Sequence, residues 1–265
     1  MALPSPDREL EPCVAASAHR PTRGARVRGV VQSPNNIEIL ADETTPLGPL
    51  CLRRRELLSE PGTVVTEITL DHQLLMSSYY TASERALARV ALEMHAGTQL
   101  RVLIGGLGLG YTAREALRSA RVARAEVVEF LPQVIDWLGR GLVPSAAELN
   151  ADERLEIVGG DIYRRLGEAP IASAPRFDLI LIDVDHSPDE QLDEASASFY
   201  SAAGLGTAKR HLAPGGVLGV WSYAESSPFA DALRDVFRDV RLEEVTYENA
   251  QEGGESSDWL FFARD

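Results

Sequence analysis

The sequence predicts an α/β protein whose sheet is mostly parallel. From residue 100 onward, short apolar runs with β-strand character alternate with segments of helical periodicity. The first of these runs leads through a glycine-rich turn directly into a helical segment, which forms a strand–turn–helix unit. Strands that alternate with helices form parallel sheets, because each helix carries the chain back to the start of the next strand.

The expected elements follow this alternation in order. Strands are expected over Leu100–Gly105, Ala125–Phe130, Arg154–Val158, Phe177–Asp183 and Gly216–Trp221. Helices are expected over Thr112–Ser119, Pro132–Gly139, Ala197–Leu212 and Pro228–Phe237. Two further strands, Val240–Tyr247 and Asp258–Ala263, are separated only by a polar loop. A terminal antiparallel hairpin on a parallel sheet is typical of the seven-stranded, Rossmann-like class I methyltransferase fold. We therefore expect this fold over residues 98–265.

The N-terminal part of the chain has a different pattern. Residues 1–31 are rich in Pro, Arg and Ala without apolar periodicity, which predicts a flexible arm. Residues 32–97 are expected to form a small antiparallel β unit and a linking helix. Its strands are predicted over Asn36–Leu40, Gly48–Leu52 and Thr63–Leu70, and its helix over Ser83–Leu92, with Thr81 or Ser83 as the N-cap.

Composition restricts the possible partners. The net charge is −14, from 26 basic and 40 acidic residues, which disfavours nucleic acid because phosphate contacts need clustered Lys and Arg. No apolar run approaches the ~20 residues that span a bilayer, and no secretory signal is visible. We expect a cytoplasmic protein without a membrane partner. Cys13 and Cys51 have no metal-type spacing, so neither a disulfide framework nor a metal site is expected.

The glycine-rich turn predicts a nucleotide-like cofactor. It contains Gly105, Gly106, Gly108 and Gly110, which allow a sharp turn and a close approach of a ligand to the backbone. The N–H groups at the start of the following helix face such a ligand. Glu129 follows about 20 residues later at the end of the second strand, where an acid can accept both ribose hydroxyls.

Polar residues recur where the other parallel strands end. Gly160-Asp161-Ile162 follows the third strand, Asp183-Val184-Asp185-His186 the fourth, and Trp221-Ser222-Tyr223 ends the fifth. Ligands of open α/β sheets bind at the carboxyl ends of the strands. These residues are therefore expected to line one site.

At this point the chain resembles the spermidine synthases, the polyamine aminopropyltransferases of the class I S-adenosylmethionine-dependent methyltransferase superfamily. The shared order is the glycine loop, Val128-Glu129, Gly160-Asp161, Asp183 and Pro214-Gly215-Gly216. The resemblance covers roughly residues 35–225 and implies S-adenosylmethionine or its decarboxylated form as cofactor. It implies that Glu129 holds the ribose, Asp161 the adenine amino group and the glycine loop the sulfonium side chain. It also implies a homodimer formed through the N-terminal β unit.

Three departures from the family pattern change the expected reaction. Gly108 occupies the place of the acid that contacts the donor's ammonium, and His186 replaces the second acid of the family's D-x-x-D motif. The Gln of the upstream D-G-x-x-Q motif is lost from Asp71–Leu75. Because a desolvated diamine needs paired acids, we expect methyl transfer to an N or O nucleophile of a small molecule. Aminopropyl transfer to an amine is the alternative, followed by a non-catalytic nucleoside-binding protein and an NAD-dependent dehydrogenase.

The expected roles of the site residues follow from the strand ends. Asp183 is the candidate general base or orienter of the acceptor, and Asp185 and His186 are expected to share that role. An alternative is that these three bind Mg²⁺. The loop glycines, Glu129, Asp161 and Ile162 are expected to bind the cofactor, with Tyr111 as a possible cover over it. The residues expected to shape the acceptor site are Tyr79, Tyr80, Glu84, Trp221 and Tyr223.

Overall fold

The chain folds as two sheets in the computed structural model, which describes residues 37–184, 186–189, 194–249 and 254–265. The N-terminal sheet is antiparallel, in the order β1-β2-β3-β4. Its strands are β1 (Ile37–Thr45), β2 (Gly48–Glu56), β3 (Val64–Leu70) and β4 (Gln73–Ser77). The predicted arm, residues 1–31, lies outside the described residues.

The second sheet confirms the predicted seven-stranded fold. Its order is β10-β11-β9-β8-β5-β6-β7. Five neighbouring strands of this order run parallel to one another: β9, β8, β5, β6 and β7. The parallel strands are β5 (Leu100–Gly105), β6 (Val122–Glu129), β7 (Leu155–Gly159), β8 (Phe177–Ile182) and β9 (Leu212–Ser222). The terminal hairpin consists of β10 (Asp239–Asn249) and β11 (Gly254–Arg264), and β11 runs antiparallel to β9.

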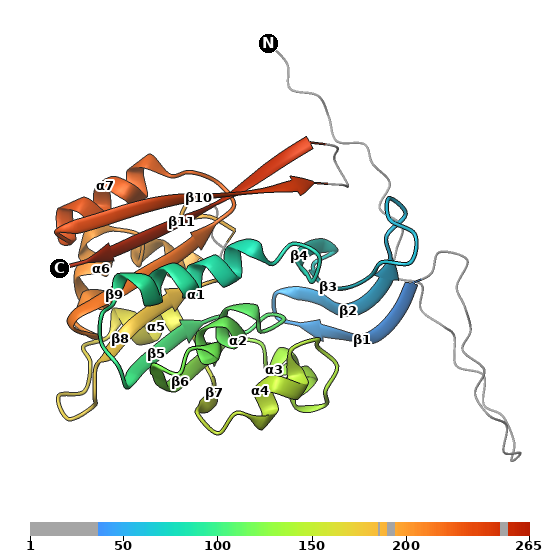
Figure 1. Cartoon of the computed structure of the whole chain (residues 1–265), viewed down its shortest axis with the longest axis horizontal. Coiled ribbons are helices and arrows are strands. Elements are labelled where there is room, and N and C mark those ends of the chain that lie inside the picture. The colour runs from blue at the N-terminus through green and yellow to red at the C-terminus, as the bar shows by residue number, and fades with distance from the viewer. Residues whose placement is uncertain (1–36, 185, 190–193, 250–253) are drawn as a thin grey trace, which may run out of the picture.

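Helices cover both faces of this sheet (Figure 1). One face carries α1 (Ala82–Met94), α2 (Tyr111–Arg118), α3 (Pro132–Gly139) and α4 (Ala146–Ala151). The other carries α5 (Ile162–Gly167), α6 (Ala202–Lys209) and α7 (Ser227–Val236). Alternate residues of a strand point to opposite faces, so Val102 and Ile104 pack with the first group of helices and Leu103 packs with the second.

The N-terminal sheet shares the core on the first face. Leu50, Leu52 and Ile68 are fully buried in the same apolar cluster as Leu107 and Leu109 of the glycine-rich turn. The sheet therefore packs directly against the turn that the sequence marks as the cofactor loop.

Three short elements were not predicted, and one helix was predicted too long. The unpredicted elements are β4, α4 and α5, of which β4 follows a two-residue turn at Asp71 and His72. Both turn residues have positive φ, at 48° and 66°, a conformation usually marked by Asn-Gly or Asp-Gly. The helix expected over Ala197–Leu212 is divided into a 3₁₀ turn, Glu194–Ser198, and α6, because Ser201 caps the start of α6 by accepting a hydrogen bond from Gly204 N.

The described helices include none that is long and apolar enough to cross a membrane.

A buried carboxylate links two strands of the N-terminal sheet. Glu67 on β3 is fully buried and accepts hydrogen bonds from Arg53 Nε at 3.0 Å and Arg55 Nε at 2.8 Å, both on β2. Each guanidinium also places a terminal nitrogen within 2.9 Å of the carboxylate. Arg53 binds Oε2 and Arg55 binds Oε1, so one carboxylate connects two positions of β2 to β3 through charge-assisted hydrogen bonds.

We expect Glu67→Ala to lower the free energy of unfolding by about 3 kcal/mol, because it leaves two partly buried guanidinium groups without their partner. Denaturant titration followed by circular dichroism measures this change. The matched control is Glu38→Ala, which removes an exposed ion pair to Arg54 with a separation of 3.9 Å and is expected to cost less than about 0.5 kcal/mol. Equal effects of the two substitutions would contradict this account of Glu67.

Candidate active site

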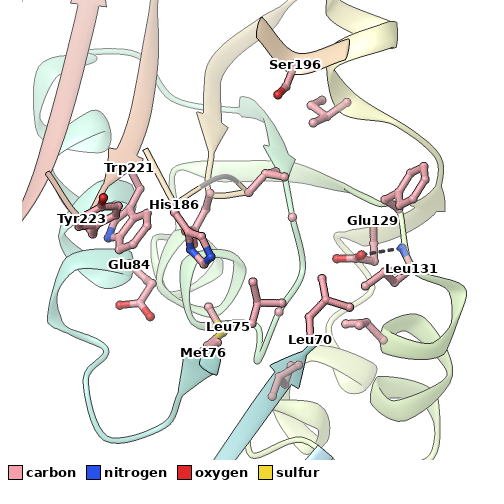
Figure 2. Close-up of a pocket in the computed structure, with 18 of the residues that line it drawn as sticks. Leu70, Leu75, Met76, Glu84, Glu129, Leu131, His186, Ser196, Trp221 and Tyr223 are labelled. Atoms are coloured by element: carbon pink, nitrogen blue, oxygen red, sulfur yellow. Dashed lines mark hydrogen bonds between the residues drawn. The ribbon is translucent and has the colours of Figure 1, made fainter. Parts of the chain in front are cut away.

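A cavity of about 370 Å³ lies at the carboxyl edge of the parallel strands. The ends of β5, β6, β7, β8 and β9 contribute to it, and β3, β4, the start of α1 and the terminal hairpin close it from the other side. Figure 2 shows Glu129 and Leu131 on one side of this cavity and Glu84, Trp221 and Tyr223 on the opposite side, with His186 between them. The cavity thus lies where the strand ends of the sequence predict a ligand site.

The glycines of the turn are required by the packing of the protein itself. Gly106, Gly108 and Gly110 have positive φ of 88°, 48° and 86°. A Cβ on Gly106 would overlap the carbonyl oxygen of Asp183, and one on Gly108 would lie 2.6 Å from Sδ of Met76. Of the four predicted glycines, Gly106 and Gly108 line the cavity, whereas Gly105 and Gly110 pack against protein behind it.

Glu129 joins the glycine-rich turn to the start of α3. Its Oε2 accepts a hydrogen bond from Leu107 N at 2.8 Å, and its Oε1 accepts one from Leu131 N at 2.7 Å. Figure 2 shows the second of these bonds. Burial raises the pKa of the Glu129 carboxyl, and the backbone N–H groups of Leu131 and Leu107 oppose that rise. The backbone N–H groups of Gly108 and Phe130 also oppose the rise, so four backbone donors surround this carboxylate at the edge of the cavity.

Asp161 and Ile162 lie beside Glu129 in the lining of the cavity. Asp161 is the N-cap of α5, and its Oδ1 accepts hydrogen bonds from Tyr163 N at 2.8 Å and Arg164 N at 3.1 Å. The Ile162 side chain fills the space above Gly105. The cap thus fixes Oδ1 of Asp161 and leaves Oδ2 to accept from a ligand.

Asp183 extends from the end of β8 into the cavity. Its Oδ2 accepts a hydrogen bond from Thr112 Oγ1 at 2.7 Å, and its backbone N–H donates to Gly105 O at 3.0 Å. Burial raises the pKa of Asp183 to about 6, the Thr112 hydroxyl opposes the rise, and the nearby Asp258 adds to it. The carboxyl therefore titrates close to neutral pH, which suits a proton acceptor.

Ser83 connects two further carboxyl groups. Its Oγ lies 2.6 Å from Asp258 Oδ2 and 3.2 Å from Glu84 Oε2, and it accepts a hydrogen bond from Trp221 Nε1 at 3.0 Å. Burial, with repulsion from Asp183, raises the pKa of Glu84 to about 8. Burial also raises the pKa of Asp258.

Aromatic rings surround these acids. The Tyr80 and Tyr247 ring centroids are 4.8 Å apart, and the Tyr247 hydroxyl lies 3.4 Å from Asp258 Oδ1. Tyr223 contacts the His186 ring, at a centroid distance of 6.5 Å, and donates its backbone N–H to His186 O at 2.9 Å. Such rings offer negative faces to a cation.

The structure brings together most of the predicted acceptor residues: Tyr80, Glu84, Trp221 and Tyr223 line the cavity, as does His186. It does not bring Tyr79 there, because the Tyr79 hydroxyl donates to Glu60, which raises its pKa to about 12. Tyr111 is buried beneath Arg85 and is not part of the lining, so it does not cover the cavity. Asp185 lies outside the described residues.

Sequence reasoning missed Asp258 and Tyr247 in the lining of the cavity. It placed the segment Asp71–Glu84 over the pocket but gave Met76 and Ser83 no role in the site. Thr81 holds the N-cap position of α1, without a side-chain cap. None of these residues belongs to a local motif. Only the hydrophobic strand pattern around Asp258 carried a signal, because it predicts that the terminal hairpin lies on the same sheet.

The lining of the cavity is strongly acidic. No lysine or arginine of the described chain contributes to it. Five carboxyl residues do: Glu84, Glu129, Asp161, Asp183 and Asp258. Buried negative charge without a basic partner is costly and favours a cationic ligand. The described residues include no group of three or more His, Cys, Asp or Glu side chains placed to hold a metal ion. The Mg²⁺ alternative includes Asp185 and is not tested.

Comparison with solved structures identifies the class of fold. A spermidine synthase in complex with the transition-state analogue AdoDATO matches with a TM-score of 0.67 and 21% identity, over 85% of this chain and 73% of that one. The spermidine synthase from Thermotoga maritima matches with a TM-score of 0.64 and 21% identity, over 85% and 71%. The fold is therefore spermidine synthase-like, within the class I methyltransferase fold.

Sequence comparison confirms the predicted resemblance to the polyamine aminopropyltransferases. Polyamine aminopropyltransferase 2 of Streptomyces coelicolor is 35% identical over 128 residues, which are 47% of this chain and 22% of that protein. The polyamine aminopropyltransferase of Bacillus mycoides is 27% identical over 157 residues, or 58% and 52% of the two chains. The matches thus span about half or less of these relatives. No family model matches the chain.

The buried position of Glu84 gives the fold a pH dependence. Its pKa is raised from the usual 4.5 to about 8, so between these values the folded state holds a proton that the unfolded state has released. This group therefore makes the fold less stable as the pH rises through that range.

We expect Glu84→Gln to be more stable than the wild type above pH 5, by an amount that grows by about 1 kcal/mol per pH unit and levels off above pH 8. Urea titrations at a series of pH values measure the difference. Glu93→Gln is the matched control, because Glu93 lies exposed on the same helix. A wild type and a Glu84→Gln variant with parallel stability curves would refute the raised pKa.

Proposed function

We propose that this chain transfers an aminopropyl group from decarboxylated S-adenosylmethionine to a small-molecule amine. The observation that carries the proposal is the acidic cavity, which has five carboxyl groups in its lining and no lysine or arginine from the described chain. Its position in a spermidine synthase-like fold and the resemblance to polyamine aminopropyltransferases support the same activity.

The residues present fit an adenosyl sulfonium donor. Glu129 and the free oxygen of Asp161 face the cavity at the ends of β6 and β7, where they can accept from ribose hydroxyls and the adenine amino group. Gly106 and Gly108 contribute backbone to the same cavity, together with Asp183. The donor, when bound, supplies a carbon bonded to a positively charged sulfur. An uncharged amine can attack this carbon and displace the sulfur.

Asp183 is the proposed proton acceptor. An amine enters at neutral pH as an ammonium ion and must lose one proton before its nitrogen can attack. A carboxyl with a pKa of about 6 is ionised at pH 7, so it can attract this ammonium and take up one proton before the nitrogen attacks. The freed lone pair can then form the C–N bond as the C–S bond breaks and the thioether leaves. Thr112 fixes the carboxylate by its hydrogen bond to Oδ2. Trp221 and Tyr80 line the same cavity.

The relatives favour aminopropyl transfer over the methyl transfer that the sequence first indicates. That indication rested on the missing acids at Gly108 and His186. The cavity nevertheless contains Glu84 and Asp258, which belong to other elements and add two carboxyl groups to its lining. A homodimer and a cytoplasmic location stay predictions.

We expect calorimetric titration to show tighter binding of decarboxylated S-adenosylmethionine than of S-adenosylmethionine, and mass spectrometry to show an amine extended by one aminopropyl group. The reason is that the described lining offers five carboxyl groups and no lysine or arginine to pair with a donor carboxylate. Tighter binding of the carboxylate-bearing form together with a methylated product would reject the proposal. Binding of methylthioadenosine without any transfer would favour the non-catalytic alternative.

We expect Asp183→Asn to lower kcat by at least about 100-fold while methylthioadenosine binding is retained. The rise of wild-type activity with pH through about 6 should disappear in this variant, because its amide does not titrate. Asp231→Asn, on the exposed side of α7, is the matched control. Full turnover by Asp183→Asn would show that another group takes the proton.

We expect Gly108→Asp alone to weaken donor binding, because the new Cβ would lie 2.6 Å from Met76 Sδ and 2.9 Å from its Cε. The double variant Gly108→Asp with Met76→Ala should regain binding and favour the decarboxylated donor more strongly than the wild type, since an acid then faces its ammonium. Calorimetry with both donors measures the preference. Met76→Ala alone is the control, and an unchanged preference in the double variant would contradict the placement of the donor.

A further inference from the structure

The sulfur atom of Met76 joins the N-terminal sheet to the glycine-rich turn. Met76 lies on β4, and its Sδ accepts a hydrogen bond from Leu109 N at 3.0 Å. The same sulfur lies 2.6 Å from the position that a Cβ on Gly108 would occupy, and the Met76 methyl group lies 2.9 Å from it. One thioether therefore contacts two consecutive residues of the turn, at the point where Gly108 has a positive φ of 48°.

The Met76 sulfur is also within reach of small solutes. The side chain is partly exposed and belongs to the lining of the cavity, as Figure 2 shows. A thioether sulfur has two lone pairs and is only a weak hydrogen-bond acceptor, so the bond from Leu109 leaves it nucleophilic. A small electrophile that enters the cavity can react with it.

Oxidation of this sulfur would change the contact with the turn. A sulfoxide carries one added oxygen and is polar and chiral, whereas the thioether is flexible and apolar. An oxygen on the side of Gly108 has no room, because sulfur and methyl group already fill the space above that residue. An oxygen on the other side of the sulfur would narrow the cavity in front of the turn. Either position alters the part of the site that is proposed to hold the donor.

We propose that Met76 is a site of oxidative modification, at which a peroxide converts the thioether to a sulfoxide and thereby weakens donor binding. The sulfur gives an electron pair to one peroxide oxygen, and the O–O bond breaks. The transferred oxygen loses its proton to the oxygen that leaves, so hydrogen peroxide yields one sulfoxide and one water. The sulfur is oxidised and the peroxide is reduced. Only the effect on the donor rests on the proposed function, whereas the change in the turn does not.

The test treats the folded chain with hydrogen peroxide, removes the peroxide and then compares treated with untreated protein. The chain has three methionines, so peptide mass spectrometry assigns each added oxygen to Met1, Met76 or Met94. We expect oxidation at Met76 to lower the affinity for methylthioadenosine by at least about 10-fold. We also expect faster amide hydrogen exchange over residues 106–112, because Leu109 N loses its thioether acceptor.

Two variants assign the effect to one sulfur. Met76→Leu keeps an apolar side chain of similar volume that peroxide does not oxidise, so its affinity and its exchange rates should be the same before and after treatment. Met94→Leu is the matched control, because Met94 is the other partly exposed methionine of the described chain, and it should lose affinity as the wild type does. Incubation of the oxidised wild type with a methionine sulfoxide reductase should restore both properties without any substitution.

The outcomes separate this inference from the proposed function. A Met76 that peroxide does not oxidise, or one whose oxidation changes neither exchange nor affinity, would overturn the proposal. A loss of affinity that persists in Met76→Leu would also overturn it. Faster exchange in the turn of an oxidised protein whose untreated form binds no methylthioadenosine would retain the modification site and reject the function.

Discussion

The absence of a side chain at Gly106 allows β5 and β8 to meet at the centre of the site. The carbonyl oxygen of Asp183 occupies the space that a Cβ would need, and Asp183 N donates to Gly105 O at 3.0 Å. This contact brings the Asp183 carboxylate beside the glycine-rich turn. Thr112, at the start of the helix that follows the turn, then orients the carboxylate through its hydroxyl. The position of the proposed proton acceptor therefore depends on one backbone contact that no larger residue permits.

The burial of acids in the cavity has an energetic cost that the fold must offset. Glu84, Asp183 and Asp258 all have raised pKa values, mainly because burial penalises their charged forms. The large apolar cores on both faces of the sheet supply the compensating stability. Strained or desolvated groups that persist in a fold are typical of functional sites, because binding of the ligand relieves their cost.

The sequence predicted the half of the site that is built from local motifs. The glycine-rich turn, Glu129 and Asp183 each follow directly from a strand and its end, so strand periodicity and the rule on carboxyl ends place them at the same edge. The two adjacent tyrosines show a limit of this reasoning. Tyr80 faces the cavity and Tyr79 bonds to Glu60, and a sequence pattern does not tell which of two neighbouring rings points inward.

The other half of the site depends on contacts between distant parts of the chain. Ser83 and Asp258 are 175 residues apart, and their hydrogen bond exists only because the terminal hairpin pairs with β9 beside the start of α1. The short strand β4, which carries Met76, follows a turn without glycine and so lacked the usual hairpin signal. Predicting these residues would have required the register of two hairpins, which side-chain periodicity alone does not fix.

The division of the cavity between local motifs and the terminal hairpin has an evolutionary consequence. The proposed adenosine side is built on β5, β6 and β7, whereas Asp258 and Tyr247 belong to two strands at the opposite end of the sheet. Substitutions in the hairpin can therefore accumulate without disturbing the glycine-rich turn. A chain of this architecture can change the terminal-hairpin wall of its pocket by substitutions in its last two strands, while the wall built on the glycine-rich turn keeps its shape.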